Sequence, residues 1–196
     1  MAFRDVAAAA YRPDRLPPKA EIGLDASGYF SLPGPVFPFG AYAAVVEVQR
    51  ETGEVAILKL VAVDDPGRVI NPLLAEGQVI GASIQGLGQA LVEEAVYDTT
   101  GQLLTATFAD YGMFRAPQAP LIETEFLETP SPFNPLGVKG VGEAGTIGTP
   151  AAVANAVMDA LAPLGIRHID FPLTPMKLWR VIQGADRGAD DQKGRA

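Results

Sequence analysis

The stretch Gly137–Leu161, GVKGVGEAGTIGTPAAVANAVMDAL, decides between fold classes for this 196-residue chain. It contains a G-x-G-x-x-G pattern that begins at Gly140, the spacing with which a Rossmann fold holds a dinucleotide pyrophosphate. That fold requires a buried strand directly before the glycines, but Thr129–Pro135 holds three prolines and cannot be a central strand. Glu143 would also put a carboxylate beside the pyrophosphate, and the two anions would repel. The residues before and within the glycine pattern therefore argue against a Rossmann fold.

The second half of this stretch predicts a helix. Thr149 offers a hydroxyl for the N-cap, and Pro150 is favoured at the first helical position, where its missing N–H costs no hydrogen bond. Apolar residues continue to Leu161, before the breakers Pro163 and Gly165. We therefore expect a helix that begins at Thr149–Pro150 and ends near Pro163.

Glu143 is the one carboxylate among these glycines. Glycines on both sides would let the backbone approach a bulky group, and a carboxylate desolvated in such a place is tuned towards general-base chemistry. A structural role fits the spacing equally well, because Glu143 could cap the helix that follows or pair with Lys139. Both interpretations stay open on the residues alone.

The rest of the chain alternates short strands and helices. Segments 41–48 and 55–63 flank a turn at Gly53 and predict an antiparallel hairpin. Further expectations are a short helix at 3–11, a helix at 71–95, a second hairpin at 95–108, strands at 122–127 and 168–170, and a helix at 174–182. Long Pro/Gly connections between these elements predict an α+β fold, with mixed or antiparallel sheets and packed helices.

Composition divides the chain into three regions. Residues 1–36 are rich in proline and glycine, which predicts an extended N-terminal arm. Residues 37–183 form the α+β domain, and residues 184–196, which are charged and lack apolar anchors apart from alanine, are expected to be a disordered tail. Within the domain, the helix at 71–95 contains four glycines, each costing about 1 kcal/mol relative to alanine. Either tight helix packing or close approach of a ligand would explain them.

The overall composition excludes several classes of function. A net charge of −8 argues against nucleic acid and against an anionic membrane surface. The chain has no cysteine and a single histidine, His168, so disulfides, Cys-ligated metal sites, His-rich metal sites and a Ser-His-Asp triad are excluded, and we assign no metal ligand. No apolar run approaches the roughly 20 residues of a membrane span. We expect a cytoplasmic protein without membrane insertion.

Separate blocks of the sequence match one family in the same order. They are Phe37–Gly40, Ala62–Pro72, Gly77–Gly81, Gln85–Leu91, Asp110–Tyr111, Asn134–Gly140 and Gly137–Pro150. In these blocks the chain resembles the large, molybdenum-binding subunit of the molybdenum hydroxylases, which include xanthine dehydrogenase and aldehyde oxidase, and it is most similar to the carbon monoxide dehydrogenase type. The resemblance runs from about Ala2 to Ile182, and it implies the C-terminal part of the molybdopterin-binding domain.

The resemblance also implies roles for individual residues. Glu143 aligns with the family's active-site glutamate, the general base in hydroxylation of an electron-poor carbon. Gln85 falls where the family contacts molybdopterin, and its amide can both donate and accept hydrogen bonds. The other cofactor-binding residues that we expect are Gly86, Lys139, Gly140, Val141 and Gly142. The substrate would be an aldehyde, an N-heterocycle or a similar small molecule.

The implied cofactor is molybdopterin with molybdenum, in the cytosine dinucleotide form. The implied partners are the remainder of the large subunit, an FAD-binding medium subunit and a small subunit with 2Fe–2S clusters. Without cysteine, this chain cannot ligate such clusters itself. The resemblance therefore implies an enzyme that works as part of a complex. The alternative is a truncated, inactive remnant that acts at most as a binding or assembly module.

Overall fold

The computed structural model describes residues 2–193, and the chain divides into two compact units, Met1–Pro33 and Gly34–Ala196. The first unit contains the helix α1 (Phe3–Ala10) and the 3-10 turn η1 (Pro13–Arg15). The predicted short helix near the N-terminus is therefore confirmed. The prolines that follow it leave the rest of this unit without regular structure.

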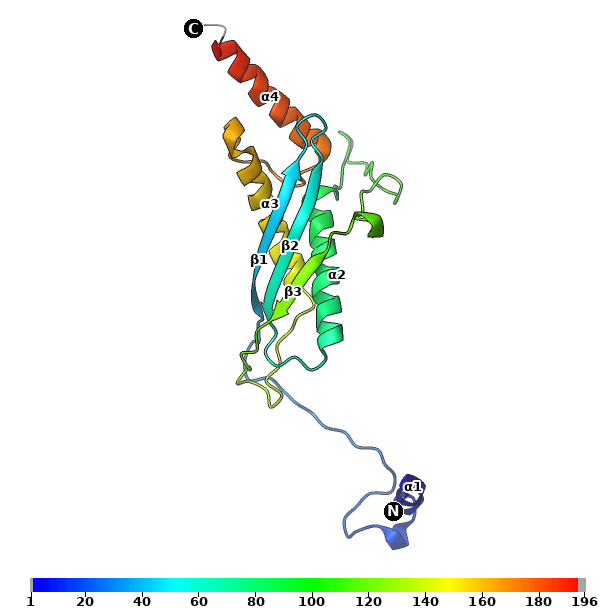
Figure 1. Cartoon of the computed structure of the whole chain (residues 1–196). Helices are drawn as coiled ribbons and strands as arrows, with labels where there is room; N and C mark the ends of the chain where they lie inside the picture. Colours follow the sequence, from blue (N-terminus) through cyan, green and yellow to red (C-terminus); the bar gives the residue numbers. More distant parts are fainter. Residues whose placement is uncertain (1, 194–196) are drawn as a thin grey trace. The chain divides into compact units, whose positions relative to one another are not determined.

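The second unit is built on a three-stranded mixed sheet (Figure 1). Strand β1 (Phe39–Val48) pairs antiparallel with β2 (Val55–Asp65), and β2 pairs parallel with β3 (Ile122–Phe126). The turn between β1 and β2 contains Gly53 at φ +74°, a left-handed conformation that glycine adopts without strain. The predicted first hairpin, the strand near residues 122–127 and the α+β class are confirmed.

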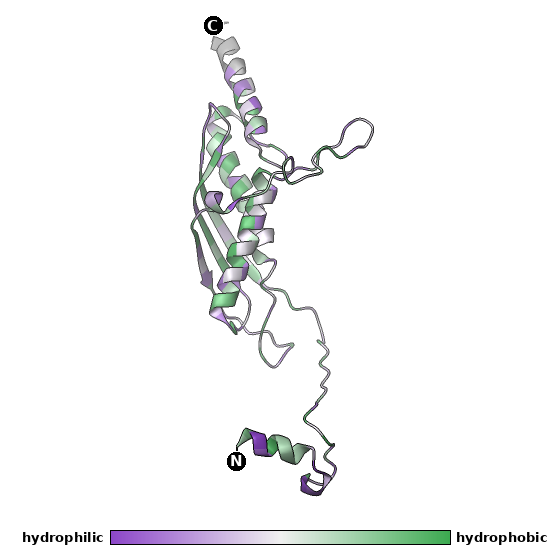
Figure 2. Ribbon diagram, turned by 90° about the vertical axis from the view of Figure 1, so that its right-hand side faces the viewer, coloured by the Kyte–Doolittle hydropathy of each residue, from purple (hydrophilic) through white to green (hydrophobic). Residues whose placement is uncertain are grey.

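Two helices, α2 (Pro72–Leu91) and α3 (Ala144–Leu161), cover one face of this sheet and contact each other (Figure 1). The helix α2 begins as predicted, because the Asn71 side chain accepts a hydrogen bond from the Leu74 N–H at 3.2 Å. In Figure 2 the green, hydrophobic residues are distributed over the strands and over both helices. Fully buried core residues include Leu87, Val153, Val157, Leu178 and Ile182.

The start of α3 differs from the sequence prediction. The helix begins at Ala144, with Pro150 in its second turn, instead of at Thr149–Pro150. Gly145 lies against the Val79 carbonyl of α2, where a Cβ would have no room, and this contact holds the first turn in helical form. Pro150 then removes only the hydrogen bond to the Thr146 carbonyl. Tertiary packing outweighs the local N-cap signal.

The composition of α3 corrects our expectation that no apolar run is long enough to span a membrane. By length and hydropathy alone, Ala144–Leu164 could cross a membrane. Its residues Val153, Val157 and Leu161 are buried in the core, however, and the helix packs on β1 and α2. Part of its apolar surface is therefore packed in the core of this unit.

Of two further short elements that we expected, one is much shorter than predicted and the other is absent from residues 2–193. The second hairpin, at 95–108, is reduced to a single bridge between Tyr97 and Leu103, because most of its side chains are exposed and an isolated hairpin has no core to pack on. Segment 168–170 forms no strand. Its two polar side chains are exposed and bond to each other, with His168 Nε2 at 2.9 Å from Asp170 Oδ1.

The last helix, α4 (Pro175–Lys193), starts where the sequence predicts but is longer. We expected it to end near Ile182, with disorder from residue 184 onward. No proline interrupts the segment, and an ion pair of 2.6 Å between Arg50 Nη2 and Asp186 Oδ1 ties it to the β1–β2 turn. The predicted tail is therefore helical through Lys193, and residues 194–196 lie outside the described chain.

Candidate functional site

The glycine-rich segment forms an open loop before α3. A Cβ built on Gly140 would meet no atom within 4 Å, and one on Gly142 would meet only Gln78 Oε1, at 3.3 Å. Glu143, the next residue, is exposed and stands at the N-cap position of α3. The backbone around Glu143 is therefore accessible to a bulky group.

The structure tests both structural explanations of Glu143. Its side chain forms no capping hydrogen bond to α3. Lys139, the other partner that the sequence suggested, forms its ion pair with Asp65, at 3.1 Å. Within residues 2–193 the Glu143 carboxylate thus has neither of the partners that would give it a structural role.

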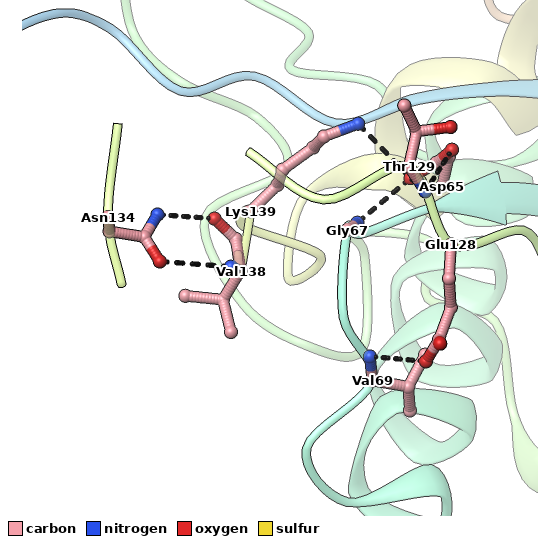
Figure 3. Close-up of polar contacts among 8 residues, drawn as sticks. All are labelled: Asp65, Gly67, Val69, Glu128, Thr129, Asn134, Val138 and Lys139. Atoms are coloured by element: carbon pink, nitrogen blue, oxygen red, sulfur yellow. Dashed lines mark hydrogen bonds and ion pairs between the residues drawn. The ribbon is translucent and has the colours of Figure 1, made fainter. Parts of the chain in front are cut away.

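Lys139 belongs instead to a buried polar network at the end of β2 (Figure 3). Asp65, 1% exposed, accepts hydrogen bonds from the Gly67 N–H at 2.9 Å, from the Thr129 N–H at 3.0 Å and from Lys139 Nζ at 3.1 Å. Burial alone would raise the pKa of Asp65, but the bonds from Thr129, Gly67 and Lys139 outweigh burial and hold the pKa well below its usual range. Lys139 also lies over the Phe39 ring, 4.5 Å from its centroid.

Gln85 lies on the exposed face of α2. Gln78 and Gln89 are also exposed. Gln85 and Gln89 follow Gln78 by seven and eleven residues, which puts them about 20° to either side of Gln78 around the helix axis. The sequence prediction included only Gln85. The periodic glutamine spacing was the signal that could have identified this whole row.

Gly86 points away from that row. It is buried, and a Cβ there would lie 3.0 Å from both Thr149 Cβ and Pro150 Cδ of α3. Packing between α2 and α3 therefore explains Gly86, whereas Gly77 and Gly81 face open space. Of the residues that we predicted, the structure brings Gly140, Val141, Gly142 and Glu143 into one exposed loop, and it places Gly86 and Lys139 in buried contacts.

A second buried carboxylate lies beneath the start of α3. Asp64, 2% exposed, accepts a hydrogen bond of 2.6 Å from the Tyr42 hydroxyl. Burial raises the pKa of Asp64, although the bond from Tyr42 partly offsets this effect. Burial, together with the neighbouring Asp64, also raises the pKa of Tyr42. These two residues and Gly148 line a cavity of about 130 Å³.

The donor set fits an organic group better than a bare metal ion. Among residues 2–193 there is no group of three His, Cys, Asp or Glu side chains that could hold a metal. The exposed site instead offers side-chain amides on α2, open glycine backbone and one carboxylate, which suit the hydrogen-bonding edges of a pterin.

Known proteins share this sequence and fold. The family model of the molybdopterin cofactor-binding domain matches residues 1–120. The nicotine 6-hydroxylase large subunit of Paenarthrobacter nicotinovorans is 40% identical over 185 residues, or 94% of this chain and 23% of the relative. The carbon monoxide dehydrogenase large chain of Hydrogenophaga pseudoflava is 37% identical, over 92% of this chain and 23% of the relative.

Solved structures give the same result. Quinoline 2-oxidoreductase from Pseudomonas putida 86 superposes with a TM-score of 0.84 at 41% identity, covering 93% of this chain and 23% of the other. Carbon monoxide dehydrogenase from Oligotropha carboxidovorans superposes with a TM-score of 0.85 at 36% identity, covering 96% and 23%. The chain thus spans about a quarter of the length of these relatives. It belongs to the molybdopterin cofactor-binding domain family, within the molybdenum hydroxylases.

Proposed function

We propose that this chain supplies the general base, and one wall of the cofactor pocket, to a molybdenum-dependent hydroxylase. The observation that carries the proposal is the state of Glu143, which is exposed between open glycine backbone and α3 and has no capping bond and no bond to Lys139. A carboxylate without a structural partner is available to accept a proton from a reacting group. Gly140 and Gly142 leave the space in which that group could approach.

The wall would be formed by the glutamine row of α2 together with the glycine loop. Gln78 and Gln85 lie about 10 Å apart along the helix, at 1.5 Å per residue, so one ligand that contacts both must be elongated. Molybdopterin in its cytosine dinucleotide form has that character. Gln85 would hold it through its amide, and Gly140, Val141 and Gly142 through their backbone. When bound, the molybdenum cofactor supplies the redox chemistry of hydroxylation.

The rest of the enzyme would come from other polypeptide segments. We propose the remainder of a large subunit, an FAD-binding subunit and a 2Fe–2S subunit, because electrons taken from the substrate need acceptors and this chain has no cysteine to ligate a cluster. The names of two relatives concern nicotine and quinoline, and that of a third an aldehyde oxidoreductase, which supports an N-heterocycle or an aldehyde as the substrate. The complex would be cytoplasmic.

The proposal is tested by co-expressing the chain with the products of its neighbouring genes and purifying the complex. We expect molybdenum in the complex and hydroxylation of at least one of nicotine, quinoline and benzaldehyde. Glu143→Gln should retain molybdenum but lower turnover by about 10²–10⁴-fold, the usual contribution of a general base. Glu125→Gln, at an exposed position of β3, is the matched control and should leave turnover unchanged.

Two results would contradict the proposal. Full turnover in Glu143→Gln would reject its role as the base. A chain that purifies without molybdenum and without any other polypeptide would reject the enzyme and support the inactive remnant.

A further inference from the structure

We infer that Asp65 and Lys139 form a positioning pair for Glu143. The ion pair between them fixes the glycine loop to the end of β2. The inference rests on the proposed function of Glu143, but the anchoring of the loop can be measured separately. Neither residue would touch the reacting atoms, because both side chains are buried, at 1% and 9% exposure. They would act through the backbone that joins Lys139 to Glu143.

The anchor of the loop is the buried Asp65 carboxylate, which accepts hydrogen bonds from several sides. The Asp65 carboxylate joins three separate segments, because its donors are Gly67 just after β2, Thr129 just after β3, and Lys139 (Figure 3). A buried ion pair with additional hydrogen bonds is hard to separate, because each charge would then remain buried without a partner and without hydration. Asp65 therefore fixes Lys139 relative to the sheet.

The backbone on either side of Lys139 is fixed as well. The Lys139 N–H donates to the Pro66 carbonyl at 2.8 Å, and the Arg68 N–H donates to the Gly137 carbonyl at 3.0 Å. The Asn134 side chain holds Val138 from the other side, through bonds of 2.9 and 3.0 Å to its carbonyl and N–H (Figure 3). Segment 137–139 is thus held by the exit of β2 and by the preceding loop at once.

The fixation is weaker beyond Lys139. Gly140 has no neighbour within 4 Å of a Cβ position, and a Cβ on Gly142 would meet only Gln78 Oε1, at 3.3 Å. The Ala144 N–H donates to the Val141 carbonyl at 3.2 Å, and Gly145 then packs tightly on α2. Only residues 140–142 separate Lys139 from Glu143, a path of at most about 3.6 Å per residue. Two of these three are glycines, which provide little stiffness of their own. The position of Glu143 therefore depends on the anchors at the two ends of the loop.

The ion pair also keeps Lys139 away from Glu143. Lys139 is four residues from Glu143, yet its ammonium group is directed to Asp65 and lies over Phe39. Without Asp65, the ammonium would lose its buried partner, and Glu143 would become an available counter-ion. Asp65 thus preserves the free state of the proposed base.

The test uses Lys139→Met, which removes the charge but retains an apolar stem over Phe39, and Lys59→Met as its matched control. Lys59 forms an ion pair of 2.9 Å with Glu123, but this pair is about half exposed on the sheet. Hydrogen exchange in the full chain should accelerate at least tenfold over residues 137–143 in Lys139→Met, and it should not change there in Lys59→Met. Unchanged exchange of this segment in Lys139→Met overturns the inference.

The second measurement uses the molybdenum-loaded complex. Lys139→Met should lower kcat per molybdenum at least tenfold with KM little changed, and Lys139→Arg should restore most of kcat, because arginine can still pair with Asp65. A purely structural role would lower the yield and the molybdenum content but leave kcat per molybdenum unchanged, which overturns the inference. If Glu143→Gln proves active, the proposed function fails, and hydrogen exchange still decides whether Lys139 anchors the loop.

Discussion

The last two residues of β2 are both buried carboxylates, yet they lie in opposite environments. Asp64 faces α3 and accepts one side-chain hydrogen bond, from Tyr42, and burial raises its pKa. Asp65 faces the loop at 129–139 and accepts bonds from Gly67, Thr129 and Lys139, which lower its pKa despite burial. Burial is nearly equal at the two residues, so the number of donors decides which protonation state the fold favours.

The largest expected effect is on the side of Asp65. Asp65→Ala leaves Lys139 as a buried cation and removes the acceptor of Gly67 and Thr129, so we expect a loss of about 3–5 kcal/mol in the free energy of unfolding, measured with urea. The control is Asp98→Ala, since Asp98 accepts bonds from Thr100 and Gln102 but lies exposed in its turn. An equal loss in both variants would show that burial adds nothing to the Asp65 network.

A smaller effect is expected on the side of Asp64. Tyr42→Phe removes the hydroxyl donor and leaves a buried carboxyl without a side-chain partner, which costs about 1–3 kcal/mol. The ring still fills the space beside Gly148, so packing should be preserved. Urea unfolding measures the change, and Tyr97→Phe, an exposed tyrosine, is the control. No change in Tyr42→Phe would mean that the bond to Asp64 contributes no stability.

The contributions of the two carboxylates to the free energy of unfolding should also depend on pH in opposite directions. Asp64 has a raised pKa in the folded state, so it binds more protons there than in the unfolded chain, and stability falls as pH rises from about 3.8 to the folded pKa. Asp65 has a lowered pKa, so its contribution is present above about 3.8 and is lost as pH falls below that value. Unfolding measured from pH 3 to 7 should show a weaker decline with rising pH in Asp64→Asn. An identical pH dependence in wild type and Asp64→Asn would contradict this assignment.

Local sequence signals predicted much of the scaffold. Alternating apolar residues and the turn at Gly53 identified the β1–β2 hairpin, and Asn71–Pro72 identified the start of α2. Signals of the same local kind were wrong at Thr149–Pro150, because the contact of Gly145 with α2 starts α3 earlier. A local pattern is reliable only where no tertiary contact competes with it.

The candidate site shows the same division. The glycines around Glu143 predicted a backbone that a bulky group could approach, and Gly140 and Gly142 are indeed exposed. The sequence analysis associated these glycines with a desolvated carboxylate, whereas Glu143 is exposed in this structure. The partner of Lys139 could not be predicted, because Asp65 lies 74 positions earlier in the sequence and is brought near only by the sheet and the loop after β3. The proximity of Tyr42 and Asp64 likewise depends on the register of β1 against β2.

The smallest expected effect compares two ion pairs that both involve β2. Lys59 and Glu123 lie 2.9 Å apart on β2 and β3 with both side chains about half exposed, whereas the pair of Lys139 with Asp65 is buried. Lys59→Met should therefore cost only about 0.2–1 kcal/mol. In 1 M NaCl, where the screening length falls to about 3 Å, that cost should vanish, while the cost of Lys139→Met should remain. Equal salt dependence in the two variants would show that water reaches Asp65, and the buried side of the comparison would then fail.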